Sequence, residues 1–458
     1  MYETSTLKQK IKLFLIILIP ILITQIGMYA MNFFDTIMAG QAGAEDLAGV
    51  AIGSNVWLPI FTGLNGIMLA ISPIVAQLKG AKQDSDIPVA VKQGAYLAAV
   101  IAIFIGVAGF FLIDPVLSLM DITDEVTYIA KYYLITLGVG IIPLFVFNIY
   151  RSFIDALGYT RISMIIILLT LPTNILFNYV FIFGKFGFPA LGGIGAGLAT
   201  ALTYWVSFII AIIILQKVQP FRHYRIFSNW IRPSLKAWGE QLKIGIPIGF
   251  AIFFETSIFA AVTFFMTAYD TYTIAAHQAA INFASLLYMM PLSIAFTLTI
   301  AVGFETGANR HRDARTYSYL GILIAVAMSV LAGGILYIFD DAVARLYSSN
   351  PNVIELTKNF IFFAIWFQLS DAVGAPIQGI LRGYRDVNIT LVMAFVSYWV
   401  IGLPSGWLLA NYTVLGPYGY WMSLIIGLTA GAITLYGRMF LLQRKNIRLS
   451  HMKKTSRH

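Results

Sequence analysis

Twelve long apolar runs, joined by short polar segments, constrain the fold of this chain more than any other feature. A helix needs about 20 apolar residues to cross the hydrocarbon layer of a membrane, which is roughly 30 Å thick. Charged residues make up only 11% of the 458 residues, too few to cover a globular core of this size. The sequence therefore predicts an all-α integral membrane protein with twelve transmembrane helices. The expected spans are residues 11–38, 47–78, 93–113, 126–147, 162–184, 193–216, 240–268, 273–305, 316–339, 353–379, 387–410 and 418–440.

The basic residues predict how these spans are oriented. All but four of the 30 lysines and arginines fall in segments that share one side of the membrane. The four exceptions are Lys131, Lys185, Arg345 and Lys358. Because basic residues concentrate in cytoplasmic loops, both termini are expected on the cytoplasmic side of the cell inner membrane. The first run is too long for a cleaved signal peptide, so it is expected to be a true span.

The net charge of +9 has the same origin as this orientation. A basic C-terminal tail next to a membrane is expected to contact anionic lipids. The charge therefore gives no reason to expect a nucleic-acid partner.

The two halves of the sequence repeat one another. The tetrapeptide F-F-D-T at residues 33–36 returns as F-F-E-T at residues 253–256, and residues 47–81 align without gaps to residues 274–308. Because six spans per half is an even number, both copies enter the membrane from the same side. The repeat predicts two six-helix bundles related by pseudo-two-fold symmetry about an axis along the membrane normal.

The repeat also predicts how the chain is divided. Residues 1–225 are expected to form the N-terminal lobe, residues 226–239 a cytoplasmic linker, and residues 240–458 the C-terminal lobe with its basic tail. In the linker, Trp230 and Trp238 alternate with basic residues, a pattern typical of a short amphipathic helix on the inner face of the membrane.

The three carboxylates that lie farthest inside the apolar runs are those of Asp35, Glu255 and Asp371. A carboxylate in the membrane costs about 2.5 to 3.5 kcal/mol on insertion, so it normally faces a protein interior or a wet cavity. Glu255 and Asp371 lie at similar expected depth, with no Lys or Arg at comparable depth. Two facing carboxylates either share a proton or hold a cation, so we predict a cation site there, with Na+ as the candidate ion. The alternative is that hydrogen bonds between helices satisfy each acid.

Asp35 has candidate polar partners in its own lobe. Asn174 and Asn178 are four residues apart and therefore share one helix face, and Thr200 and Thr203 lie on the next span. These residues predict an N-lobe proton or cation site around Asp35. Simple hydrogen bonding between helices is the alternative explanation of the asparagine pair.

Other residues are candidates for a substrate cavity and for a hinge. Polar, aromatic and Met side chains suit a cavity that accepts ligands of varied shape. The candidate cavity residues are Asn55, Asn282, Tyr288, Met289 and Phe254. Pro20, inside the first span, is expected to kink that helix and to free a backbone carbonyl.

The sequence has no feature that indicates catalysis. It contains no cysteine, which excludes a disulfide, a thiolate metal site and a thiol nucleophile. It also lacks G-x-S-G, H-E-x-x-H and G-x-G-D elements, so an intramembrane hydrolase is not expected. We expect no enzyme activity and no cofactor.

Taken together, the motifs resemble those of the multidrug and toxic compound extrusion (MATE) family, specifically its bacterial NorM-type branch, over essentially the whole chain. The segments that carry the resemblance are residues 33–36, 253–256, 275–294, 368–373 and 191–197. The resemblance implies two six-helix lobes around a V-shaped cavity and rocker-type alternating access. It also implies export of lipophilic, often cationic drugs and dyes in exchange for inward Na+ or H+.

The same resemblance implies roles for the buried acids. Glu255 and Asp371 form the implied cation site, and Asp35 with Asn174 and Asn178 forms the implied N-lobe site. Some archaeal relatives carry Asp where this chain has Asn178, so an N-lobe mechanism that uses two acids does not carry over. We expect a monomer whose partners are drugs, dyes and membrane lipids, with the choice between Na+ and H+ left open.

The alternative function is that of a lipid-linked precursor flippase from the same superfamily. Such a protein is expected to line its cavity with Arg or Lys to bind a pyrophosphate. No basic residue is expected at mid-membrane depth in this chain, which favours the drug antiporter.

Overall fold

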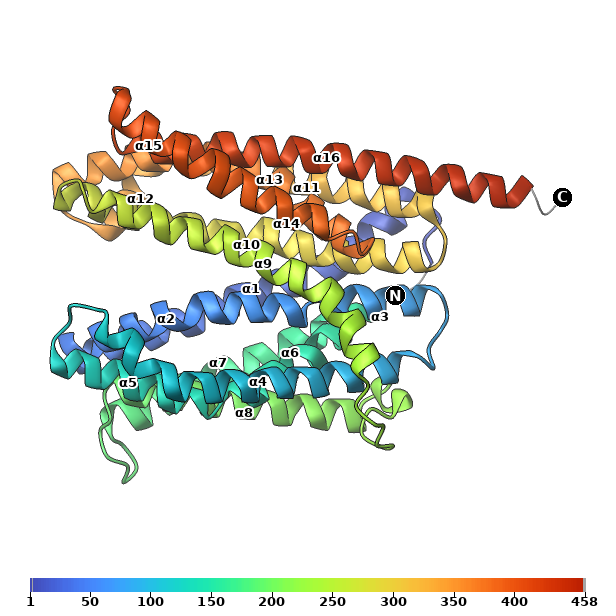
Figure 1. Ribbon diagram of the computed structural model, residues 1–458, viewed down its shortest axis with the longest axis horizontal. Helices are drawn as coiled ribbons and strands as arrows, with labels where there is room; N and C mark the ends of the chain where they lie inside the picture. Colours follow the sequence, from blue (N-terminus) through green and yellow to red (C-terminus); the bar gives the residue numbers. More distant parts are fainter. Residues whose placement is uncertain (2, 456–458) are drawn as a thin grey trace. The chain divides into compact units, whose positions relative to one another are not determined.

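The structure is a computed structural model that describes Met1 and residues 3–455, and this part of the chain contains helices and loops but no strand (Figure 1). The helices of the first half are α1 (Leu7–Ala42), α2 (Ala44–Met68), α3 (Ile71–Gly80), α4 (Ile87–Ser118), α5 (Asp124–Gly138), α6 (Ile141–Ala156), α7 (Thr160–Phe183), α8 (Gly193–Lys217) and the 3-10 helix η1 (Phe221–Tyr224). Those of the second half are α9 (Leu235–Met266), α10 (Thr271–Gly307), α11 (His311–Ile338), α12 (Asp340–Tyr347), α13 (Pro351–Gly383), α14 (Asn388–Ala394), the π-helix η2 (Phe395–Gly402), α15 (Leu403–Tyr412) and α16 (Tyr418–Thr455).

Eleven helices or helix runs in the described chain are long and apolar enough to cross a membrane. Helices α2 and α3 together make one of them, Ala44–Gly80, and α14, η2 and α15 make another, Asn388–Tyr412. The bent pair α5 and α6 makes a twelfth if it is one span. The predicted all-α fold is therefore confirmed, and the chain is a multi-pass membrane protein.

The bend of 50° between α5 and α6 has a cause in the sequence. Gly138 and Gly140 flank it, and glycine is about 1 kcal/mol less favourable than alanine inside a helix. Pro143 has no backbone N–H, so it cannot donate the helical hydrogen bond to the carbonyl of Val139. A Cβ atom at Gly140 would lie 2.7 Å from Cα of Ala201, so this glycine also allows α8 to pack closely at the bend.

The chain divides into two compact units. The first unit contains Met1 and Ile19–Gly245, and the second contains residues 3–18 together with residues 246–455 of the described chain. The expected lobe boundaries stay a prediction.

The first part of α1 is fixed within the second unit by polar contacts. Lys10 is buried, and its Nζ forms a 3.0 Å ion pair with Asp313 on α11. The same Nζ donates a hydrogen bond to the backbone oxygen of Thr4 at 2.9 Å. The hydroxyl groups of Thr4 and Tyr317 are 2.9 Å apart. These contacts explain why residues 3–18 belong to this unit.

The predicted amphipathic helix in the linker is wrong. Residues 225–234 contain no helix, and α9 begins only at Leu235. The Ser234 hydroxyl accepts a hydrogen bond from the backbone amide of Ala237 at 3.2 Å, which is the contact of a helix N-cap. Trp230 is 74% exposed and lies in this irregular segment rather than on a helix.

A glutamine on α4 holds this irregular segment in place. Gln93 donates from Nε2 to the backbone oxygen of Arg232 at 2.8 Å. Its Oε1 accepts from the backbone amide of Ser234 and from the indole of Trp238, both at 3.0 Å. The backbone polar groups of the segment are thus bonded to a buried side chain, so the segment does not need to be helical.

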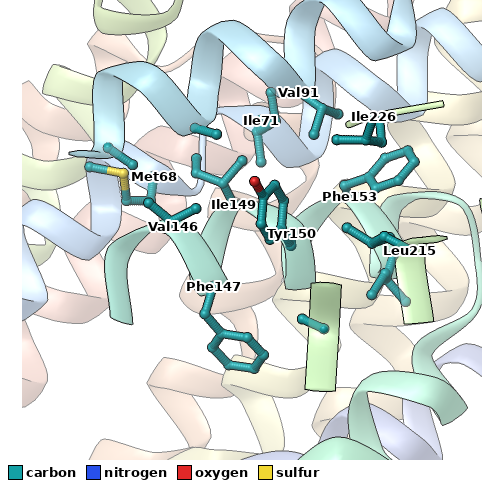
Figure 2. Packing of buried hydrophobic residues seen from close by; sticks show 14 of the residues in the cluster. Met68, Ile71, Val91, Val146, Phe147, Ile149, Tyr150, Phe153, Leu215 and Ile226 are labelled. Atoms are coloured by element: carbon teal, nitrogen blue, oxygen red, sulfur yellow. The ribbon is translucent and has the colours of Figure 1, made fainter. Parts of the chain in front are cut away.

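Helix α6 contributes many side chains to a buried hydrophobic cluster of the first unit, part of which Figure 2 shows. Val146, Ile149 and Phe153 on this helix are buried. Their neighbours in the same core come from α3, α4 and α8 and include Ile71, Val91 and Leu215. This packing fixes α8, the helix that carries Thr200 and Thr203.

Helices α10 and α13 pack closely in the second unit. A Cβ atom at Gly383 would lie 3.0 Å from the backbone nitrogen of Gly303, and one at Gly379 would overlap the backbone of Ala295. The Thr299 hydroxyl donates to the backbone oxygen of Gly379 at 2.9 Å. Small residues four apart let helix backbones approach each other in a membrane, so this contact fixes the C-terminal end of α13 against α10.

Candidate cation-binding sites

Asp35 lies in a hydrogen-bonded cluster of the first unit, here termed the Asp35 cluster, with Asn174, Asn178, Thr200 and Thr203. Asn178 donates from Nδ2 to Oδ1 of Asp35 at 2.6 Å, and the Thr200 hydroxyl donates to Oδ2 at 2.9 Å. Asn178 also donates to Oδ1 of Asn174 at 3.3 Å, and the Asn174 amide donates to the Thr203 hydroxyl at 3.4 Å. The structure thus brings together all the residues expected around Asp35. Their role as a proton or cation site stays a prediction.

The cluster is built from one face of each of two neighbouring helices. Asn174 and Asn178 are four residues apart on α7, and Thr200 and Thr203 are three apart on α8. A Cβ atom at Gly195 would overlap the backbone of α7, so this glycine allows the two helices to lie close enough to share one carboxylate.

The Asp35 cluster has unused capacity to bind a cation. Asp35 is only 8% exposed, and the buried Oδ1 of Asn178 accepts no hydrogen bond from the described residues. A buried acceptor without a donor costs about 1 to 3 kcal/mol. A small cation beside Asp35 would remove that cost, and the carboxylate, amide and hydroxyl oxygens of the cluster are hard ligands that fit such an ion.

A second cluster, in the second unit, surrounds Glu255 on α9. This Glu255 cluster also contains Asp371, Gln378 and Arg382 on α13 and Tyr288 on α10. Gln378 donates from Nε2 to Oε1 of Glu255 at 2.5 Å. Asp371 lies close enough for the charges of the two carboxylates to interact, and both charges reach Tyr288. The structure therefore places Glu255 and Asp371 in one cluster, while their function as a cation site stays a prediction.

Asp371 is the member of this cluster with a carboxylate oxygen left over. Its side chain is 6% exposed, and the buried Oδ2 accepts no hydrogen bond from the described residues. Two carboxylates that interact in a low-dielectric interior repel each other while both are ionised. A cation between Asp371 and Glu255 would reduce this repulsion and satisfy the free oxygen.

A basic residue, Arg382, stands near Glu255 in this cluster. Arg382 is 6% exposed, and its charge and that of Glu255 act on each other. Arg382 lies near the C-terminal end of α13, where a count along the chain places it away from the membrane centre. Long helical side chains point back toward the helix N-terminus, so the guanidinium reaches toward Gln378 and Glu255. The side chain therefore brings its charge closer to the acids than the backbone position alone indicates.

Sequence reasoning also missed Gln378, although the sequence contains a signal for it. Asp371, Gln378 and Arg382 are separated by seven and four residues, which places all three on one face of α13. A polar stripe along an apolar helix is expected to face other protein groups rather than lipid. The stripe thus predicts the side of α13 that meets Glu255.

Tyr398 is a further neighbour that no sequence signal indicates. It is buried within η2, and the charges of Glu255 and Asp371 both reach its hydroxyl. The adjacent Trp399 donates from its indole to the backbone oxygen of Phe254 at 3.2 Å, which ties η2 to α9 next to the acid. π-Helical stretches are rare, and those that occur are often found at functional sites.

The two matching acids have different partners, so the repeat does not reproduce the site. Asp35 is hydrogen-bonded to α7 and α8. Glu255 is hydrogen-bonded to α13. In the repeat, the Gly383-Tyr384 pair at the end of α13 matches Gly158-Tyr159 after α6, so α13 corresponds to α5 and α6 rather than to α7. The two tetrapeptides therefore place similar acids in chemically distinct surroundings.

The candidate cavity residues lie in varied surroundings. Asn55 on α2 and Asn282 on α10 are exposed within their own units, and Met289 is half-buried. Phe254 packs against Phe395 with ring centroids 5.1 Å apart. Their assignment to a substrate cavity stays a prediction.

Pro20 lies inside α1, which runs through it as one helix from Leu7 to Ala42. The Thr24 hydroxyl donates to the backbone oxygen of Pro20 at 2.8 Å. This contact satisfies a backbone carbonyl close to the proline, and the predicted hinge stays a prediction.

The MatE family profile matches residues 20–180 and again residues 247–408, so it covers most of the chain and finds the two halves separately. The chain belongs to the MATE family. MATE proteins are transporters, so the prediction of no enzyme activity is confirmed.

Individual MATE proteins match nearly the whole chain. A protein of Oceanobacillus iheyensis named probable multidrug resistance protein NorM is 62% identical over 447 residues, which cover 98% of this chain and 100% of that one. A protein of the same name from Halalkalibacterium halodurans is 58% identical, and the match covers 97% of each chain. The crystal structure of the eukaryotic MATE transporter AtDTX14 gives a TM-score of 0.86 at 21% identity, covering 97% of this chain and 99% of that one. At that identity the structural match shows the fold alone.

Proposed function

We propose that this MATE-family chain exports lipophilic, often cationic compounds from the cell in exchange for inward Na+ or H+. The names of its relatives from Oceanobacillus iheyensis and Halalkalibacterium halodurans, probable multidrug resistance proteins, support drugs as the substrates. One observation carries the exchange: Glu255 and Asp371 share a buried cluster in which Oδ2 of Asp371 accepts no hydrogen bond from the part of the chain that the structure describes. Such an oxygen needs a positive charge or a proton.

Exchange follows if drug and cation compete for one negative charge. A bound cation neutralises the Glu255 cluster, and its release leaves a charge that attracts a cationic drug. Because each ligand lowers the affinity for the other, the protein alternates between the two loaded states. Of the two ions, Na+ is favoured at this cluster, because carboxylate and amide oxygens are hard ligands.

The Asp35 cluster supplies a second ion-linked contact in this proposal. Two donors, Asn178 and Thr200, bind the two carboxylate oxygens when Asp35 is ionised. A protonated carboxyl has an O–H group that donates and whose oxygen is a poorer acceptor, so proton uptake would weaken one of these bonds. That change would loosen α1 from α7 or α8, and the proline at position 20 of α1 is a place where the helix can then bend.

The remaining features of the proposal concern the membrane context. Both termini are cytoplasmic, the two lobes are residues 1–225 and 240–458, and the protein works as a monomer with its basic tail on anionic lipid. The distribution of lysines and arginines supports the orientation.

The flippase alternative is not favoured by the buried arginine. A pyrophosphate needs an excess of positive charge, whereas Arg382 interacts with Glu255, in a cluster whose two acids together outweigh it.

Everted membrane vesicles test the proposal directly. Ethidium transport is measured at fixed pH with a Na+ gradient, with a proton gradient, and with neither. We expect transport driven by at least one gradient, and Asp371→Asn to lose most of it, with Glu355→Gln on the same helix as a control for removal of a carboxylate. Equal transport in vesicles with and without the protein under both gradients would overturn the proposal.

A further inference from the structure

We propose that Arg382 is a fixed counter-cation of the Glu255 cluster, which it holds at one net negative charge so that the site accepts a single monovalent cation and rejects divalent ones. This inference rests on the proposed function, because it assigns the specificity of the proposed cation site. It concerns a residue outside the two acids implied to bind the ion.

The first observation is the order of charges along α13. Asp371, Gln378 and Arg382 lie on one helix face, in that order toward the C-terminus. Gln378, the middle member, donates to Oε1 of Glu255. Glu255 is therefore held between the two charged residues, with the acid on one side and the arginine on the other.

The second observation is the cavity beside Glu255. Arg382 and Gln378 line a small cavity whose opposite wall comes from α9 and includes Ala251 and Ile252. These two residues precede Glu255 by four and three positions, so they share its helix face one turn away. The arginine therefore faces the side of α9 that carries the acid.

The third observation is that Arg382 is buried and lies on a closely packed stretch of backbone. It is 6% exposed, and an uncompensated charge at such a position is strongly unfavourable. It lies between Gly379 and Gly383, the two glycines at which α13 packs on the α10 backbone. The backbone that carries it cannot shift without breaking that contact, so the guanidinium stays within reach of the cluster.

The balance of charges then determines what can bind. Two ionised carboxylates give a charge of −2, and the arginine reduces it to −1. One Na+ brings the cluster to neutrality, whereas a divalent cation would leave it positive. Because Gln378 is bonded to Glu255, Oδ2 of Asp371, which has no hydrogen-bond partner among the described residues, is the oxygen left for the exchanged ion.

Four variants separate this account from a structural role. Arg382→Gln gives the cluster a net charge of −2, and Glu255→Gln gives it a net charge of 0. The double variant, which combines Arg382→Gln with Glu255→Gln, returns the net charge to −1. Arg382→Lys keeps the wild-type charge. Arg385→Gln, which removes an exposed arginine three residues farther on, is the matched control.

The measurement is equilibrium binding of 22Na+ to the purified full-length protein at fixed pH, with Ca2+ as competitor. Wild type, Arg382→Lys and Arg385→Gln are expected to bind Na+ and to keep it bound when Ca2+ is added at equal concentration. Arg382→Gln is expected to bind Na+ at least tenfold more tightly and to lose it to Ca2+. The double variant is expected to keep Na+ bound in the presence of Ca2+, as the wild type does. Removal of an arginine with a purely structural role would not restore this selectivity.

Unchanged Na+ affinity and Ca2+ resistance in Arg382→Gln would overturn the inference. A double variant that binds Na+ no more tightly than Glu255→Gln would also overturn it. This comparison can be made even if Arg382→Gln alone does not fold. Absence of Na+ binding by the wild type would also overturn it. The vesicle assay separates that failure from failure of the proposed function, because proton-driven ethidium export would persist in the first case only.

Discussion

Gln378 on α13 donates a 2.5 Å hydrogen bond to the Glu255 carboxylate on α9 and is the hydrogen-bond link between the proposed ion site and the helix that carries Asp371. A hydrogen bond to a charged group contributes about 1.5 to 3 kcal/mol, which corresponds to about a tenfold or larger change in an equilibrium. The position of Glu255 relative to Asp371 therefore depends on this amide.

Replacement of Gln378 by alanine is expected to weaken Na+ binding by about tenfold, because Glu255 loses its donor and its fixed position. The matched control is Gln368→Ala on the same helix, which removes a buried amide that donates to the backbone oxygen of Leu287 at 3.0 Å. Binding of 22Na+ to both purified variants is the measurement. Equal affinities for the two variants would show that Gln378 has no special role.

Asp35→Asn is expected to reduce drug efflux strongly while expression stays near normal. The amide keeps the size of the side chain and can still accept from Asn178 or Thr200, but it removes the ionisable charge. Asn178→Ala is expected to do less, because it removes a supporting dipole. Thr36→Val is the control, since that exposed hydroxyl bonds to the backbone oxygen of Asn32 on its own helix. Ethidium export at the wild-type rate from Asp35→Asn would refute the assignment.

Single cysteines in this cysteine-free chain test the orientation. Thr413→Cys, in the loop after α15, is expected to react with an impermeant thiol reagent only from outside the cell. Gln83→Cys, in the exposed loop before α4, is expected to react only from the cytoplasm. Intact cells expose the outer side of the membrane to the reagent, and everted vesicles expose the cytoplasmic side. Labelling of Thr413→Cys from the cytoplasmic side alone would show that the predicted orientation is wrong.

Lys10→Met is expected to lower thermal stability, because it breaks the 3.0 Å ion pair with Asp313 and the bond to Thr4. The loss is expected to be about 1 kcal/mol, below the value for a fully buried pair, since Asp313 is 31% exposed. Lys8→Met removes an exposed lysine two residues earlier and is expected to have no effect. The midpoint of thermal aggregation in detergent is the readout, and equal midpoints for the two variants would contradict this view of the N-terminal segment.

The transmembrane fold and the Asp35 cluster could be predicted because their signals are local. Long apolar runs indicate spans without knowledge of tertiary contacts. Asn174 and Asn178 reveal a shared helix face through their spacing alone. Both features follow from the spacing of residues along single helices, which can be read from the sequence without knowledge of how the helices pack.

The missed features depend on tertiary contacts or on unusual helix geometry. The linker is irregular because Gln93, more than a hundred residues away, bonds to its backbone. Tyr398 belongs to the Glu255 cluster within a π-helix that no sequence pattern marks. The interaction of Arg382 with Glu255 was missed because a long side chain moves its charge away from its own backbone.

Coupling between Glu255 and Asp371 is the central claim, and a double-mutant cycle measures it most directly. Na+-driven ethidium efflux is measured in everted vesicles at fixed pH for the wild type, Glu255→Gln, Asp371→Asn and the double variant. If the two acids hold one ion, each single variant loses most of the Na+-driven rate and the double variant is scarcely worse than either, since residues that act together are strongly non-additive. Losses that multiply independently would show that the two carboxylates serve separate sites and would contradict the account.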